Sequence, residues 1–265
     1  MTKLVYIGGY GHSGSTLLEY LLAASPEVVA CGEVVSVLRE RARKGKCTCR
    51  RQVKDCPVWG SLLGPSEALD GRSHKDLALA LVAQDRGKHT LLVDSSKTAW
   101  RSIAVPFRLA CALGQDFELV HLVRDPRAVS WSGVKKASRR GARPLMAMRC
   151  ASAALGWWIA NLACELFGRI YPDRYVRLRY EDLARSPSEA MRDLFAKLRS
   201  GLEWRPEEIG GNDNRHQLYG NRMRAANLSL AEVKEDAAWK RDMPGAYRSL
   251  VSLLTAPLRW RYGYA

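Results

Sequence analysis

Apolar residues in this chain fall into short runs separated by longer segments with helical spacing. Four short runs are rich in β-branched residues and predict buried strands, at Leu4–Gly8, Thr90–Val93, Phe117–Val123 and Tyr175–Leu178. Helical spacing covers Thr16–Ala24, Lys75–Ala83, Ile103–Leu113 and Pro144–Ile170. Because strands that alternate with helices indicate a parallel sheet covered on both faces, the sequence predicts a three-layer α/β fold with a central parallel sheet.

The chain after the last predicted strand contains a long irregular segment between helices. Ser186–Glu189 has the composition of a helix start, and that helix is expected to end near Leu198. Gly201–Asn227 is rich in Gly, Asn, Arg and Pro and predicts a long loop, which in a compact domain is usually functional or mobile. Two more helices are expected, at Leu230–Arg241 and Gly245–Leu254. Since no repeat or linker interrupts the pattern, residues 1–265 are predicted to form a single domain.

The composition narrows the classes of partner. Lysine and arginine number 42 against 27 acidic residues, and the formal net charge of +15 favours polyanions such as nucleotides, acidic saccharides or an anionic membrane face. The basic residues are dispersed without a recognised nucleic-acid module, so nucleic acid is not an expected partner. No run of about 18 uncharged apolar residues and no signal-peptide pattern are present, so we expect a soluble, cytoplasmic protein without a transmembrane segment. The odd number of cysteines, seven, fits a reducing compartment.

The first predicted strand leads into a glycine-rich motif at Gly9–Thr16. This motif matches the phosphate-loop spacing G-x-x-x-x-G-K-S/T except that Ser15 replaces the lysine. A helical pattern follows, so backbone N–H groups and the helix dipole are expected to converge on a phosphate. The residues expected to bind it are Gly11, His12, Ser13, Gly14, Ser15 and Thr16. In phosphoryl transfer, the lysine of the P-loop supports the β and γ phosphates. Because this chain has Ser15 in place of that lysine, an ordinary ATPase or kinase is disfavoured.

Two motifs resemble those of sulfotransferases that use PAPS, 3′-phosphoadenosine 5′-phosphosulfate. His12–Leu18 is similar to the family's 5′-phosphosulfate loop, although the family generally carries lysine or arginine where this chain has His12. Arg124 at the end of the third strand, with Ser132 eight positions later, resembles the 3′-phosphate motif. A guanidinium and a hydroxyl near a helix start suit a phosphate monoester, so the resemblance implies that Arg124 and Ser132 bind the 3′-phosphate.

The resemblance also implies three catalytic residues. Lys97, after the second predicted strand, stands where the bacterial, carbohydrate-type and tyrosylprotein-type branches carry a lysine that approaches the sulfonate. Glu33 stands where the tyrosylprotein branch keeps its general base. Lys97 and a protonated His12 are expected to stabilise negative charge during transfer. Because an unperturbed imidazole loses its charge near neutral pH, activity is expected to fall on the alkaline side. A solvated lysine and a helix-capping glutamate are the structural alternatives for Lys97 and Glu33.

Two further segments resemble parts of the family. The late loop, about residues 201–227, contains a Gly-Asn-x-x-Arg-like segment that folds over the nucleotide in the family, which implies contacts from Gly220, Asn221, Arg222 and Arg224. A basic surface loop is the alternative. Cys47, Cys49 and Cys56 lie in an insertion, about residues 45–72, similar to one in some bacterial members. With Cys31 they could supply four thiolates to zinc, but their spacing is not a standard zinc motif, so no metal is expected. Structural zinc, a local disulfide and free thiols in a packed lid stay open as the states of these cysteines.

Taken together, the motifs predict a single-domain enzyme with a P-loop-like fold. It is expected to transfer a sulfonate group from PAPS to a hydroxyl of a small-molecule, carbohydrate or lipid-linked acceptor, with PAP as the product. A P-loop phosphotransferase and a non-catalytic protein that binds PAP or polyanions stay open as alternatives. The sequence indicates neither the acceptor nor the oligomeric state.

Overall fold

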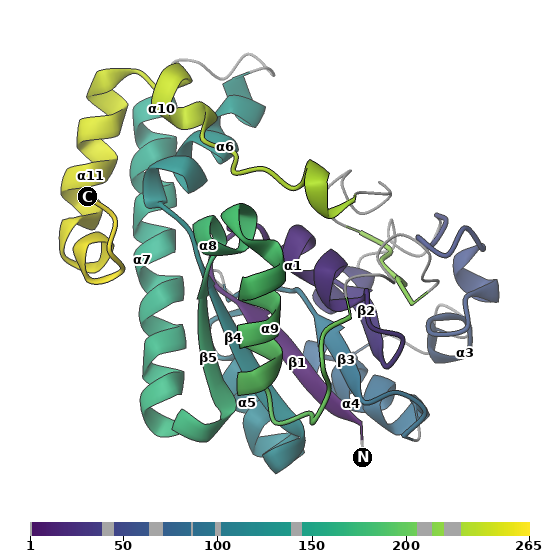
Figure 1. Cartoon of the computed structure of the whole chain (residues 1–265). Coiled ribbons are helices and arrows are strands. Elements are labelled where there is room, and N and C mark those ends of the chain that lie inside the picture. The colour runs from purple at the N-terminus through teal and green to yellow at the C-terminus, as the bar shows by residue number, and fades with distance from the viewer. Residues whose placement is uncertain are drawn as a thin grey trace.

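A parallel sheet forms the centre of the protein in a computed structural model (Figure 1). The structure describes residues 2–38, 45–63, 71–85, 87–98, 102–138, 145–205, 214–219 and 229–265. Within them, five strands form one sheet in the order β2-β3-β1-β4-β5, and every neighbouring pair is parallel. The strands are β1 (Lys3–Gly8), β2 (Val28–Gly32), β3 (Leu91–Asp94), β4 (Phe117–Val123) and β5 (Tyr175–Arg179). This sheet confirms the predicted three-layer α/β fold.

Helices cover both faces of the sheet (Figure 1). They are α1 (Ser15–Leu22), α3 (Gly60–Leu63), α4 (His74–Asp85), α5 (Val105–Leu113), α6 (Pro126–Ser138), α7 (Met146–Ile170), α8 (Tyr180–Arg185), α9 (Pro187–Lys197), α10 (Ala238–Asp242) and α11 (Gly245–Arg261). Short 3-10 turns lie at Val34–Leu38, Val53–Asp55, Gly114–Asp116, Pro172–Arg174 and Leu230–Glu232. In the first strand, Leu4 and Tyr6 pack with α4, α5 and α7, whereas Val5 and Ile7 pack with α1, α8 and α9. This alternation of side chains across the strand produces two apolar layers from one continuous apolar run.

Among the described strands, β2 is the one that the sequence pattern missed. Val28–Gly32 follows α1 after a short turn, and its five residues include Ala30 and Gly32, which are poor strand formers. It lies at the edge of the sheet, but residues 214–216 cover its outer side. The N–H of Ala30 donates to the Asn214 carbonyl (2.9 Å), and the N–H of His216 donates to the Ala30 carbonyl (2.7 Å). The late segment therefore pairs with this edge, which explains why every residue of β2 is buried.

One helix prediction near the C-terminus is wrong, and a second has the right start but ends too early. The expected helix over Leu230–Arg241 is a 3-10 turn at Leu230–Glu232 followed by non-helical backbone up to α10. The Asp236 N–H donates to the Tyr180 hydroxyl (3.1 Å), a tertiary contact that holds this backbone away from a helical path. The last helix continues to Arg261 rather than ending near Leu254, with Pro257 inside it. Its buried face packs along α7, and this packing favours a continuous helix past the proline.

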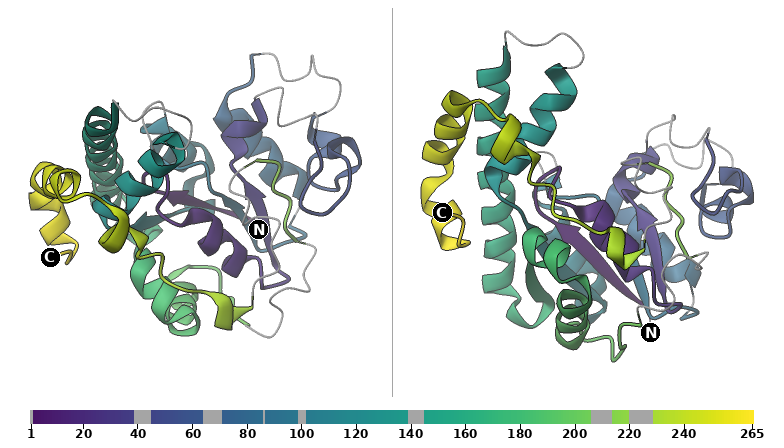
Figure 2. Two further views of the ribbon diagram at one scale, coloured as in Figure 1. Left: turned by 90° about the horizontal axis from the view of Figure 1, so that it is seen from above. Right: turned by 45° about the horizontal axis from the view of Figure 1, so that its top comes forward.

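Among the described helices, α7 alone is long and apolar enough to cross a membrane by length and composition. Half of its most apolar 18-residue window is buried within the protein, and the helix packs against α6, α11 and the sheet. Core helices of globular proteins commonly share these properties, so they carry no argument for a membrane span. Figure 2 shows α7 and α11 at one end of the molecule and the cysteine-bearing segment with α3 at the opposite end.

Candidate functional site

The loop between β1 and α1 has the backbone conformation of an anion-binding turn. Gly9, His12 and Gly14 have φ angles of 122°, 67° and 96°, in or near the left-handed region. A Cβ atom on Gly14 would lie 2.4 Å from Cδ2 of Tyr180, so only glycine fits where α1 begins. Within the described part of the chain, no side chain caps the N-terminus of α1. Its first N–H groups therefore face the loop without a side-chain acceptor, as a phosphate site requires.

Ser13 gives independent support for an anion site in this loop. Its side chain is 3% exposed, and its Oγ atom has no hydrogen-bond partner among the described residues. A buried hydroxyl without a partner costs about 1–3 kcal/mol, so such groups are rare unless a ligand satisfies them. A phosphate oxygen is an acceptor that would satisfy this hydroxyl. The predicted loop residues from Gly11 to Thr16 thus fit a phosphate in both backbone shape and hydrogen bonding.

Arg124 and Ser132 reach this loop from the next strand and helix. The Arg124 Nη1 donates to the His12 carbonyl (3.0 Å), and Ser132 Oγ lies 3.4 Å from His12 Nδ1. Arg124 follows β4 directly, and α6 begins at Pro126, so the eight-residue spacing places Ser132 on the same side of α6 as the loop. The structure therefore brings together His12, Arg124 and Ser132, which the sequence motifs had paired with two different phosphates.

The guanidinium of Arg124 is held in a fixed orientation. It stacks over the Tyr180 ring with its central carbon 4.2 Å from the ring centroid. Its Nη2 donates to the Asp236 carbonyl (2.8 Å) and to the Asp236 carboxylate (3.1 Å). Neither Asp236 nor Tyr180 was among the predicted site residues. Asp236 was hidden because the sequence around it resembles a helix, and only its tertiary contact with Arg124 reveals a role.

Glu33 and Lys97 form a second cluster at the ends of β2 and β3. Lys97 Nζ makes an ion pair with Glu33 Oε1, and Ser36 Oγ donates to Glu33 Oε2 (3.1 Å). Thr98, which follows Lys97, makes two hydrogen bonds with the phosphate loop. Its N–H donates to the Gly9 carbonyl (2.9 Å), and its Oγ1 accepts from the Gly9 N–H (2.9 Å). The predicted base and the predicted lysine therefore lie together, directly beside the loop.

A family comparison agrees with this arrangement. Residues 5–206 match the model of the sulfotransferase family, which covers more than half of the chain. The chain belongs to the sulfotransferase family. Membership confirms the resemblance found in the two phosphate motifs, and sulfotransfer is the activity of the family as a whole. Curated protein sequences include no significant match to this sulfotransferase.

Solved structures share the fold of this sulfotransferase. The sulfotransferase domain from the Synechococcus PCC 7002 olefin synthase has a TM-score of 0.62 at 19% identity, covering 100% of this chain and 95% of that domain. The sulfotransferase domain from the curacin biosynthetic pathway also has a TM-score of 0.62, at 20% identity, covering 100% and 98%. Sulfotransferase STF9 from Mycobacterium avium has a TM-score of 0.54 at 15% identity, covering 98% and 76%. At these identities the likeness establishes the fold.

Glu19 is a site-positioning residue that the sequence did not reveal. This side chain of α1 is buried, accepts a hydrogen bond from the Gly32 N–H through Oε1, and accepts another from Ser95 Oγ (2.9 Å) through Oε2. Burial raises the pKa of its carboxyl to about 7, although hydrogen bonds from Ser95, Gly32 and Gln217 oppose the rise. Glu19 therefore joins the ends of β2 and β3, which carry Glu33 and Lys97. A glutamate within the apolar pattern of Leu17–Leu22 was the available signal.

The predicted nucleotide-covering residues, Gly220, Asn221, Arg222 and Arg224, lie outside the described residues. Of the late loop, the structure describes residues 201–205 and 214–219, and residues 214–216 lie beside β2. The second of these parts also brings His216 to the cysteine-bearing insertion, where Cys47, Cys49, Cys56 and His216 form one group. The expected fourth member, Cys31, is not part of it. Cys31 lies inside β2 with its sulfur facing the Val29 carbonyl at 3.9 Å, because the strand turns that side chain into the core.

Proposed function

We propose that this sulfotransferase uses PAPS and transfers its sulfonate group to a hydroxyl of a small-molecule, carbohydrate or lipid-linked acceptor. The observation that carries the proposal is the contact of two anion-binding elements at His12. One is the phosphate loop with the buried, unsatisfied Ser13 hydroxyl, and the other is the Arg124–Ser132 pair. Such an arrangement suits a nucleotide with separate anionic groups at its 5′ and 3′ positions.

The loop residues from Gly11 to Thr16 would hold the 5′-phosphosulfate through backbone N–H groups and hydroxyls. Ser15 in place of the P-loop lysine fits a donor that has no β and γ phosphates at this position. Arg124 and Ser132 would hold the 3′-phosphate, since a guanidinium already oriented by an aromatic ring loses little freedom on binding. We also assign nucleotide contacts to the late loop, at Gly220, Asn221, Arg222 and Arg224.

The chemistry follows from the Glu33–Lys97 pair. Glu33 would accept the proton of the acceptor hydroxyl while the acceptor oxygen attacks the sulfur in line. The bond between sulfur and the 5′-phosphate oxygen breaks as the new bond forms, and PAP leaves with the electron pair. Lys97 and a protonated His12 would stabilise the negative charge on the sulfonate and the leaving oxygen. The ion pair supports this assignment because the Glu33 carboxyl and the Lys97 amine lie together, and Thr98 next to Lys97 is hydrogen-bonded to Gly9 of the phosphate loop.

Ligand-dependent thermal stability tests the donor. PAP at about 100 times its dissociation constant should stabilise the protein by about 2.7 kcal/mol and raise Tm by several degrees. ATP with magnesium at the same concentration should raise Tm less. Arg124→Lys, which keeps the charge but removes the fork, should weaken PAP binding about 10-fold or more. The same substitution at exposed Arg192 is the control and should leave PAP binding unchanged. Stabilisation by ATP with magnesium in preference to PAP would overturn the donor assignment.

Transfer of labelled sulfate from PAPS tests the chemistry. Across a panel of hydroxyl acceptors, the wild-type protein should transfer label and Glu33→Gln should lose most of the transfer, on the order of 100-fold, while still binding PAP. Transfer that survives in Glu33→Gln would show that another group is the base. PAP binding without transfer to any acceptor would favour a non-catalytic binding protein. Replacement of His12 by lysine should remove the expected loss of activity at alkaline pH.

A further inference from the structure

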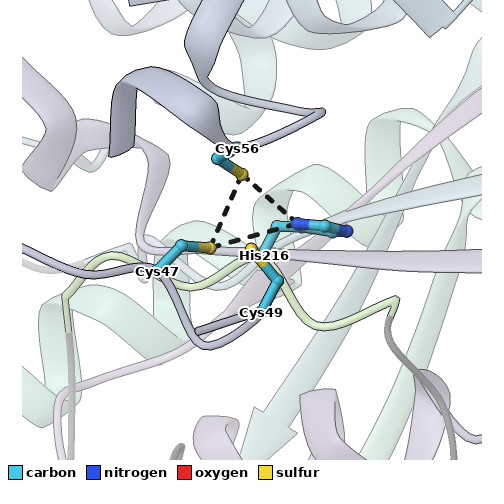
Figure 3. A group of neighbouring side chains, drawn as sticks. All are labelled: Cys47, Cys49, Cys56 and His216. Carbon is cyan, nitrogen blue, oxygen red and sulfur yellow. Dashed lines mark hydrogen bonds between the residues drawn. The ribbon is translucent and has the colours of Figure 1, made fainter. Parts of the chain in front are cut away.

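A group of metal-ligating side chains lies in the cysteine-bearing insertion, apart from the proposed reaction site. Figure 3 shows Cys47, Cys49, Cys56 and His216 with their sulfur and nitrogen atoms directed toward a common centre. Each residue offers one ligand atom, and all four atoms lie within 4.8 Å of one another. Cys47, Cys56 and His216 are 4%, 3% and 6% exposed. The group is therefore a buried cluster and not a chance gathering of surface thiols.

The distances between ligand atoms match a tetrahedral metal site. Zinc binds sulfur at about 2.3 Å and imidazole nitrogen at about 2.0 Å, so a tetrahedron separates two sulfurs by about 3.8 Å and a sulfur and a nitrogen by about 3.5 Å. The Cys47 and Cys56 sulfurs are 3.6 Å apart. His216 Nδ1 lies 3.3 Å from the Cys56 sulfur and 3.9 Å from the Cys47 sulfur. Three thiolates with one imidazole in this geometry select zinc over magnesium or calcium, which require oxygen ligands.

The backbone of the insertion is built to present the three cysteines. Lys46 and Gln52 form an antiparallel bridge, and between them the Arg50 N–H donates to the Cys47 carbonyl (2.9 Å). Arg50 has a φ of 66°, a left-handed conformation that turns the chain sharply after Cys49. The following 3-10 turn at Val53–Asp55 then brings Cys56 back to the first two cysteines. These two turns therefore bring the three cysteines together, although their spacing in sequence is not that of a standard zinc motif.

The fourth ligand comes from a distant part of the chain. His216 is fixed to β2 through its N–H, and its carbonyl accepts a hydrogen bond from the Trp59 indole of the insertion. The neighbouring residues also join the two segments. The Thr48 N–H donates to the Gln217 carbonyl (3.2 Å), and the Gln217 N–H donates to Thr48 Oγ1 (2.8 Å). The histidine is therefore delivered to the cysteines by a defined network of backbone contacts.

We propose that Cys47, Cys49, Cys56 and His216 bind one structural Zn²⁺ ion that fastens the insertion to the segment beside β2. Four protein ligands complete the tetrahedron and leave no position for a substrate, so the ion has a structural role and takes no part in sulfonate transfer. A Cys47–Cys56 disulfide explains the group less well. It requires the sulfurs to close from 3.6 Å to about 2.05 Å and leaves the orientation of Cys49 and His216 without a purpose.

Metal analysis of the purified protein tests this proposal without any activity assay. Protein prepared under reducing conditions, without chelators, should contain about one zinc ion per chain by plasma mass spectrometry. Cys49→Ser should lose the zinc, and Cys49 is the ligand of choice because it is only partly buried. Cys111→Ser and Cys31→Ser are matched controls outside the group, one exposed and one buried, and both should retain the zinc.

Substitution of the histidine separates metal binding from simple packing. His216→Ala should lose zinc, whereas His216→Cys should retain it because four thiolates form an equally good tetrahedral site. Wild-type protein should also bind Co²⁺ and show the absorption of tetrahedral thiolate coordination. Three results would each overturn the proposal: zinc-free wild type that takes up neither Zn²⁺ nor Co²⁺, zinc retained in Cys49→Ser, or a Cys47–Cys56 disulfide in protein alkylated before reduction.

Discussion

Replacement of Glu19 by glutamine should change how the stability of this sulfotransferase depends on pH. Glu19 is buried in α1 and holds the Gly32 N–H and the Ser95 hydroxyl. Glutamine has nearly the same shape and keeps one acceptor oxygen, but its amide has no proton to lose in this pH range and stays uncharged. The substitution therefore isolates the free energy that ionisation of this carboxyl costs in the folded protein.

The expected magnitude follows from the pKa. The carboxyl pKa is 4.5 ordinarily and about 7 in the folded protein, where burial raises it. Each pKa unit corresponds to about 1.4 kcal/mol, so ionisation of Glu19 lowers the free energy of unfolding by about 3 kcal/mol. Between pH 4.5 and 7 the unfolded chain has released a proton that the folded protein retains. The contribution of Glu19 to the free energy of unfolding is thus fully present below pH 4.5 and is lost as pH rises to about 7.

Equilibrium urea unfolding from pH 4 to 8 at constant ionic strength, followed by tryptophan fluorescence, measures the effect. The unfolding free energy of Glu19→Gln minus that of wild type should rise by about 3 kcal/mol across this range. Other titrating groups are common to both proteins and cancel in the difference. Glu203→Gln, the same substitution at an exposed site, should differ from wild type by less than about 0.5 kcal/mol at every pH. A difference between Glu19→Gln and wild type that does not change with pH would refute the reasoning.

Three further predictions concern the same region. Gly14→Ala should destabilise the protein by about 2 kcal/mol or more in thermal unfolding, because φ is 96° and Cβ would meet the Tyr180 ring. Gly11→Ala, where Cβ would meet no described atom within 4 Å, should cost less than about 1 kcal/mol. Burial lowers the pKa of His121 to about 4, so in urea unfolding the free energy of wild type minus that of His121→Asn should fall by about 3 kcal/mol from pH 6.5 to 4. Asp236→Asn should tighten PAP binding up to about fivefold by calorimetry, since it removes the carboxylate that competes for Arg124.

The sequence predicts four of the five described strands. The strands β1, β3 and β4 are mainly apolar and buried, whereas β5 alternates apolar residues with Arg177 and Arg179, and all four positions were predicted to within about two residues. Strand β2 was missed because its burial depends on residues 214–216, which are far away in sequence. The same reason explains the wrong helix before α10, where the contact between Asp236 and Tyr180 overrides the local preference.

The residues of the candidate site also differ in whether the sequence predicts them. The motif resemblance singled out Arg124 and Ser132, and both lie against His12 of the phosphate loop, Arg124 from the end of β4 and Ser132 from α6. Residues that act across the fold carried little local signal. Glu19 differs from its helix only as a charged residue in an apolar pattern, and His216 joins the cysteines only through the pairing of its segment with β2. A motif can thus be found in one sequence, whereas a contact between residues far apart in the chain is found only from the fold.

On the proposed mechanism, the two ion pairs of the site respond differently when the donor binds. Arg124 lies against Asp236, whose side chain is 56% exposed, and Lys97 lies against Glu33, whose side chain is 20% exposed. An exposed carboxylate regains its hydration when it is displaced, so the 3′-phosphate can replace Asp236 as the partner of Arg124 at little cost. Glu33 is more enclosed and is held by the Ser36 hydroxyl, so it stays in place while Lys97 turns to the sulfonate. Similar ion pairs therefore serve as an exchangeable contact at one end of the donor and as a retained base at the other.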